Sequence, residues 1–103
     1  MIRLRRNRFH ELASRQLDLF AAGEGDLLED ARTAEDAWNR TGRDDAEEAY
    51  ADWQLVADAI AERLLDLREA YASTLDAATA LEYRAAFDRA ANSRFPRFTE
   101  LLG

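Results

Sequence analysis

One long amphipathic stretch, residues 44–71, constrains the fold of this chain more than any other feature. Apolar or small side chains recur there in steps of three and four, so they share one stripe of a helix. The stripe consists of Ala46, Tyr50, Trp53, Ala57, Ile60, Leu64, Leu67 and Tyr71. At 1.5 Å per residue this helix is about 42 Å long, more than any other segment of the chain covers alone. We therefore expect shorter helices to pack against it piecewise.

The remaining sequence predicts three shorter helices, over residues 8–22, 26–40 and 77–92. The second is joined to the long helix by a short connection at 41–43, so the two should form an antiparallel hairpin that brings Trp38 near Tyr50 or Ala46. The last helix should return along the second half of the long helix. The predicted fold is all-α, a four-helix bundle-like domain built on one central helix at about residues 44–72. Residues 1–103 form one domain, with a short basic N-terminal segment at about 1–8.

Turn and capping residues mark the ends of these helices. Gly23 and Gly25 should interrupt the chain, with Asp26 as the N-cap of the second helix. Gly42 is expected to end that helix in the left-handed conformation. Asp44 and Asp76 are the expected N-caps of the last two helices. Pro96 prevents the last helix from continuing, and a short final turn should then place Phe95, Phe98 and Leu101 under the bundle.

The composition is that of a single folded helical domain. The 103 residues suffice for one modest core, and 48% hydrophobic with 34% charged residues is typical of a globular chain. No Cys is present, so neither a disulfide nor a thiolate metal site is available. No apolar run approaches the length of a membrane span, and the basic N-terminus lacks the apolar region of a secretory signal. We expect a cytoplasmic protein without membrane contact.

Charge is distributed unevenly along the chain. The net charge is −7, but residues 1–20 carry five Arg against two acids, a local charge of +3. The remainder, at −10, should repel nucleic acid. Contact with nucleic acid is therefore expected to be weak and confined to the N-terminal segment, at Arg3, Arg5, Arg6 and Arg8.

No pattern of reactive side chains predicts catalysis. His10 is the only histidine and has no Glu or second His at helical spacing on its own face. The acids occur in adjacent pairs (Glu29-Asp30, Glu35-Asp36, Asp44-Asp45 and Glu47-Glu48), and adjacent helical residues diverge by about 100°. These pairs read as a solvated surface. We expect no catalytic residue, no metal, no cofactor and no enzymatic activity.

Five consecutive residues resemble a known peptide motif. Gln16-Leu17-Asp18-Leu19-Phe20 is similar at all five positions to the sliding-clamp-binding peptide of many bacterial replication and repair proteins. The resemblance implies that Gln16 enters a small polar pocket of the clamp, while Leu19 and Phe20 fill the neighbouring hydrophobic cleft. Leu17 and Asp18 bridge them. It covers five of 103 residues and implies nothing about the rest of the fold.

The same five residues also fit the apolar face of the first helix. Gln16, Leu17 and Phe20 continue the stripe begun by Phe9, Leu12 and Ala13. Leu19 lies off that stripe, so a helical, core-forming segment predicts an exposed Leu19 and a buried Phe20. A docking peptide that is accessible in the folded chain requires an exposed Phe20, whereas a peptide released by local opening does not.

Three functional hypotheses follow from the sequence. The first is a small, non-catalytic DNA replication or repair accessory protein that binds the sliding clamp. The alternative is a helical dimer or adaptor that binds another protein through the long helix, with no clamp or DNA link. Its expected contact stripe is Tyr50, Trp53, Ile60 and Leu64, because two or three short helices need not cover the whole long one.

Direct nucleic-acid binding by the N-terminal arginines is the third hypothesis. Arg94 and Arg97 would join them, with Phe9, Phe95 and Phe98 stacking on bases. It ranks last because the rest of the chain is acidic.

Overall fold

The structure is a computed structural model that describes residues 8–99. Over this range the chain is helical and contains no strand. The elements are α2 (His10–Gly23), α3 (Gly25–Arg40), a 3₁₀ turn η1 (Arg43–Asp45), α4 (Ala46–Ala72), α5 (Ala77–Arg94) and α6 (Pro96–Thr99). The predicted all-α fold around one long helix is confirmed. Residues 1–7, with Arg3, Arg5 and Arg6, and residues 100–103, with Leu101, lie outside the described range.

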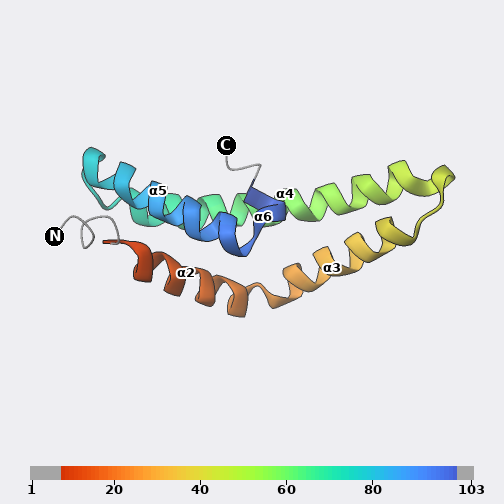
Figure 1. Ribbon diagram of the computed structural model, residues 1–103, viewed down its shortest axis with the longest axis horizontal. Coiled ribbons are helices and arrows are strands. Elements are labelled where there is room, and N and C mark those ends of the chain that lie inside the picture. The colour runs from red at the N-terminus through yellow and green to blue at the C-terminus, as the bar shows by residue number, and fades with distance from the viewer. Residues whose placement is uncertain (1–7, 100–103) are drawn as a thin grey trace.

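Two parts of different thickness are built along α4 (Figure 1). We call one the body: α2, the second half of α4 and α5 pack there as three helices. We call the other the hairpin arm: residues 25–58, in which α3 runs antiparallel to the first half of α4. The short helix α6 lies against α4 where the two parts meet. The molecule is elongated, at 56 × 23 × 22 Å.

The core of the body surrounds Tyr83 and Phe87 of α5. Both side chains are completely buried, together with Leu17 of α2 and with Ile60 and Leu64 of α4. Aromatic rings join the three helices here. The ring centroid of Tyr83 lies 5.6 Å from that of Phe9, which is edge-on to it, and 4.7 Å from that of Tyr71. Burial of several large apolar side chains at one point is the main source of stability in so small a domain.

The junction of α2 and α3 differs from the expectation. Only Glu24 leaves the helical conformation, at φ −111° and ψ 29°, and its backbone N–H still donates to the carbonyl of Phe20. Gly23 ends α2 and Gly25 already belongs to α3. Asp26 therefore lies within the first turn of α3 and does not cap it, although a carboxylate there still suits the helix dipole. The break is one residue long. The chain does not reverse its direction here, so neither glycine forms the turn that the sequence predicted.

Two further helix ends were predicted wrongly. Gly42 is extended (φ −73°, ψ 171°) rather than left-handed, and the hydroxyl of Thr41 donates to the carbonyl of Ala37 near the end of α3. Asp44 belongs to the 3₁₀ turn before α4, and Asp45 precedes that helix without a capping hydrogen bond. The N-cap at Asp76 is confirmed, because its carboxylate accepts from the N–H of Thr79 at 2.9 Å.

Four charged side chains connect α4 to α5 on the surface of the body. Arg84 donates two hydrogen bonds to Glu69, at 2.8 and 2.9 Å, and Arg68 donates to both Glu69 and Asp88. The hydrogen bonds from Arg84, joined by those from Arg68, lower the pKa of Glu69 from its usual 4.5 to about 2.

We expect the lowered pKa of Glu69 to make stability depend on pH in the acid range. A depressed carboxylate pKa contributes stability above the unfolded value, and that stability is lost as the pH falls from about 4.5 to about 2. In Glu69→Gln the contribution is missing, so the melting temperatures of wild type and variant should converge as the pH approaches 2. Thermal unfolding followed by circular dichroism between pH 7 and pH 2 measures this. A difference that stays constant over the range contradicts the expectation.

Candidate functional site

Three aromatic side chains gather on the hairpin arm. Trp38 of α3 lies edge-on to Tyr50 of α4 at 4.7 Å between ring centroids, and Trp53 lies 5.6 Å from Trp38. The sequence prediction that Trp38 meets Tyr50 is confirmed. Both tryptophans are only half-buried and Tyr50 is 43% exposed. The rings therefore hold the two helices together while part of each still faces solvent.

The hairpin arm lacks a closed core of its own. Between Arg32 and Val56, not one side chain is fully buried, and the first fully buried residue of α4 is Ala57. Two helices alone cover only one side of each other, which leaves the flanks of their apolar stripes open to water. In folded proteins a further helix, from the same chain or from another, covers such an open apolar flank.

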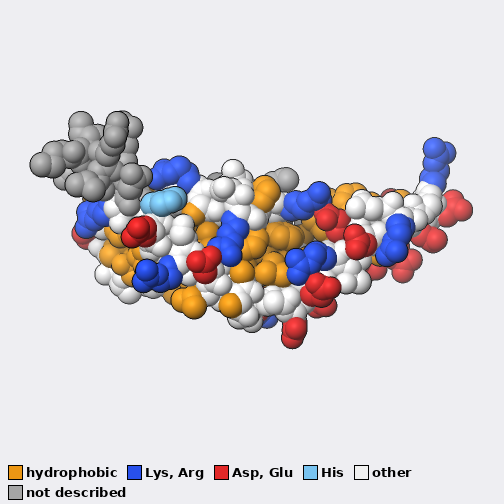
Figure 2. Space-filling view, turned by 60° about the horizontal axis from the view of Figure 1, so that its bottom comes forward, with side chains coloured by type: hydrophobic (Ala, Val, Ile, Leu, Met, Phe, Trp, Pro, Cys, Tyr) orange, Lys and Arg blue, Asp and Glu red, His pale blue; other side chains and the backbone are white. Residues whose placement is uncertain are grey.

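Two separate grooves are found near the joint at Glu24. One, with a volume of about 390 Å³, lies between the end of α2 and the second half of α4. The other, of about 260 Å³, lies between α3, α4 and α6, where the hairpin arm meets the body, and we call it the junction groove. Its lining combines Leu28, Ala31, Arg32 and Glu35 of α3, Trp53 of α4, and Arg94, Phe95, Arg97 and Phe98. Figure 2 shows this face, with hydrophobic side chains in its centre and charged ones around them.

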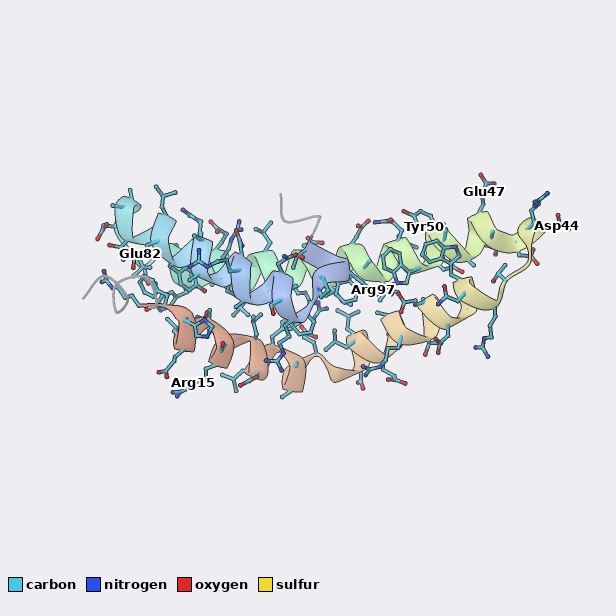
Figure 3. The ribbon with its side chains drawn as sticks, in the orientation of Figure 1. Arg15, Asp44, Glu47, Tyr50, Glu82 and Arg97 are labelled. Atoms are coloured by element: carbon cyan, nitrogen blue, oxygen red, sulfur yellow. The ribbon has the colours of Figure 1, made fainter. Side chains whose placement is uncertain are left out.

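Ion pairs fix the rim of the junction groove. Arg97 bonds Glu35 across the groove, and Arg94 bonds Asp18 of α2. Figure 3 shows Arg97 on α6 near the middle of the molecule, with Tyr50 further along the hairpin arm. Exposed ion pairs of this kind contribute little to the free energy of unfolding. They do hold the long arginine side chains beside the apolar residues that line the groove.

The predicted contact stripe on α4 is divided by the fold. Ile60 and Leu64 are completely buried within the chain, so they cannot contact a partner and that part of the prediction is wrong. The reason is that α2 and α5 both pack on the second half of α4. Tyr50 and Trp53, on the first half, keep partly exposed rings as the prediction requires.

The segment Gln16–Phe20 is part of helix α2. Leu17 is completely buried and Phe20 is 8% exposed, whereas Leu19 is 69% exposed and Asp18 lies at the surface. This is the pattern expected of a core helix.

Gln16 is tied to the core by a hydrogen bond. Its Oε1 atom accepts from the hydroxyl of Tyr83 at 2.7 Å. Burial raises the pKa of Tyr83 to about 12, although this hydrogen bond acts in the opposite direction. The amide that the resemblance assigns to a clamp pocket is thus engaged within the chain.

The other candidate residues lie at the surface. Of the four N-terminal arginines only Arg8 is described; it stacks over Phe9 at 5.2 Å and lies 3.9 Å from Glu82. His10 is exposed, and so are the adjacent acid pairs except the half-buried Glu35. Within residues 8–99 no three His, Cys, Asp or Glu side chains group in a way that could hold a metal ion.

Sequence reasoning missed the aromatic lining contributed by the C-terminal turn. Phe95 and Phe98 lie on either side of Pro96, and were predicted to lie on the underside of the bundle or to stack on nucleic-acid bases. In the structure, Phe95 packs edge-on against Phe20 at 5.7 Å and also lines the junction groove. The helix break at Pro96 was the available signal, because it turns α6 back toward α4.

Comparison with known proteins adds no assignment. No family model, no curated protein and no solved structure matches this chain. In the described part of the chain, no helix combines the length and the apolar character needed to cross a membrane.

We expect two neighbouring substitutions in α2 to have very different effects on stability. Phe20→Ala empties a core position and should cost about 3–5 kcal/mol of unfolding free energy. Leu19→Ala removes an exposed side chain and should change it by less than about 0.5 kcal/mol. Chemical denaturation of both variants measures the difference. Equal costs would mean that α2 does not bury Phe20 as described.

Proposed function

We propose that this protein is a non-catalytic helical interaction module that assembles with other helices through its hairpin arm. The observation that supports this most is the absence of any fully buried side chain between residues 32 and 56, in a segment that carries both tryptophans of the chain. A helix pair with half-exposed aromatic rings is stabilised when a further helix covers them.

The composition of the hairpin arm also suits an interface. Tryptophan and tyrosine provide most of the binding energy at protein interfaces when a partner fully desolvates them. Here Trp38, Tyr50 and Trp53 form one cluster, and the junction groove continues it with Phe95 and Phe98. The apolar surface is framed by charged side chains, which is the usual arrangement of an apolar centre within a polar rim.

We expect a photoreactive phenylalanine analogue at position 50 to cross-link the protein to its partner in the cells that produce it. The same group at position 81 is the matched control, because Leu81 is even more exposed, at 67%, but lies on α5 of the body. Exposure alone would favour position 81. Tyr50→Glu, at a side chain outside the core, should weaken the assembly by about 2 kcal/mol or more.

The outcome at the two positions decides the proposal. Cross-links that form at position 50 and not at 81 support the hairpin arm as the docking site. Equal cross-linking at both positions, or none at position 50 in a folded protein, contradicts it.

A second candidate function is binding of the bacterial sliding clamp through Gln16–Phe20. One observation favours it beyond the sequence match. The residue that the resemblance assigns to the polar pocket, Gln16, and its two apolar anchors, Leu19 and Phe20, all line the groove between α2 and α4, next to Gly23 and Glu24. Local opening at that junction would free the end of α2 at less cost than global unfolding.

We expect a peptide of residues 12–24 to bind the clamp more tightly than the intact chain does. In the intact chain Phe20 must first leave the core, which reduces the apparent affinity by the fraction of molecules that are open. Titration of the clamp with peptide and protein, each with Gln16→Ala and Leu19→Ala as controls, measures this. Absence of binding by the peptide removes this candidate, whatever the intact chain does.

A further inference from the structure

The connection between α2 and α3 leaves the helical path at one residue and resumes it at once. We call residues 23–25 the joint; Figure 1 shows the two helices meeting there at an angle. The N–H of Glu24 donates to the carbonyl of Phe20 at 2.8 Å, and the carbonyl of Glu24 accepts from the N–H of Leu28 at 3.0 Å. Both hydrogen bonds span four residues, as in an α-helix. The joint is therefore a small departure from one continuous helix.

The two glycines of the joint are not required by its geometry. Gly23 and Gly25 belong to the helices on either side, and a Cβ atom on either would meet no other part of the described structure within 4 Å. Glycine weakens a helix relative to alanine because it has more conformational freedom to lose. The chain therefore gives up helix stability on both sides of Glu24 where no steric reason demands it. The joint is easier to open than the helices that it connects.

The last turn of α2 is held to the rest of the body by few side chains. Within residues 20–23 only Phe20 is buried, and its ring lies edge-on to Phe95 at 5.7 Å between centroids. The groove of about 390 Å³ lies between this turn and the second half of α4, so the turn is not closely packed there. A segment with few buried contacts opens at a lower free energy than the whole domain.

One ion pair attaches the joint to α4. Arg63 donates to both carboxylate oxygens of Glu24, at 2.6 and 2.9 Å. Glu24 is the residue at which the helix breaks, so the pair holds the break itself in place. The side chain of Arg63 is exposed, and an exposed pair contributes little to the free energy of unfolding. It can therefore be broken and formed again while the domain stays folded.

We propose that the joint is a hinge, with the Glu24–Arg63 ion pair as its latch, at which the last turn of α2 opens while the core around Tyr83 stays folded. Opening frees Phe20 and widens the groove that it lines beside α4. The motion requires neither a partner helix nor a clamp. For the second candidate function, it is the step that gives a partner access to Gln16–Phe20.

Hydrogen exchange of single amides in the intact protein, followed by NMR, tests the hinge. We expect the amides of residues 20–24 to be about tenfold or more less protected than those of Tyr83 and Phe87, which report unfolding of the core. In Arg63→Gln the protection of residues 20–24 should fall by about a further two- to fivefold, the range that an exposed ion pair supplies. Arg32→Gln is the matched control, because it breaks an exposed pair with Glu29 on α3, away from the joint.

A second variant should close the hinge. Gly23→Ala combined with Gly25→Ala fits the structure without a clash and should raise the protection of residues 20–24 by about tenfold, because alanine favours the helix on both sides. Gly42→Ala makes the same change in open space at the other end of α3 and should leave that protection unchanged. Exchange rates are compared as protection factors, which remove the effect of the new side chains on intrinsic exchange. Circular dichroism shows that each variant remains folded.

Three results would overturn the proposal: equal protection of residues 20–24 and of the core amides, equal effects of Arg63→Gln and Arg32→Gln, or no gain of protection in the double alanine variant. The exchange is measured without any partner, so these results leave the hairpin arm and the clamp candidate to their own tests. Conversely, a peptide of residues 12–24 that fails to bind the clamp removes that candidate and leaves the hinge in place.

Discussion

The structure depends on the burial of Tyr83 at the point where three helices meet. Its ring contacts Phe9 ahead of α2, Tyr71 on α4 and Phe87 on its own helix, and its hydroxyl donates to Gln16. A buried hydroxyl without a partner costs about 1–3 kcal/mol, and the side-chain oxygen of Gln16 removes that cost by accepting the hydrogen bond. Through this one residue the first, third and last long helices hold a fixed register, and the body follows from it.

The hairpin arm is the counterpart of that well-filled body. It extends α4 beyond the reach of α2 and α5, and between residues 32 and 56 its largest internal contact is a cluster of three aromatic rings. Part of each ring remains exposed to solvent because two helices cannot enclose it. The contrast between a three-helix body and a two-helix arm on the same spine is the reason that we locate function in the arm.

Much of the fold was predictable from periodicity, and most of the surface chemistry was not. The long helix, the antiparallel return at 41–43 and the cap at Asp76 follow from local rules about spacing and capping, so they were correctly predicted. The joint at Glu24 was misplaced because two nearby glycines signal a turn that the chain does not make. The stripe on α4 was predicted as one surface, but Ile60 and Leu64 are buried while Tyr50 is not. Which half of a stripe is covered depends on where other helices end, and that is a tertiary property. The grooves combine residues from three or four helices and so leave no pattern in the sequence.

The positions of the two tryptophans have a practical consequence. Trp38 and Trp53 are the only tryptophans in the chain, and both belong to the hairpin arm. Indole fluorescence therefore reports on the arm and on the junction groove that Trp53 lines, whereas backbone circular dichroism averages over every helix. Any event that covers or separates the two helices of the arm changes the emission without a label. The protein thus carries an intrinsic fluorescent probe in the segment whose side chains are least buried.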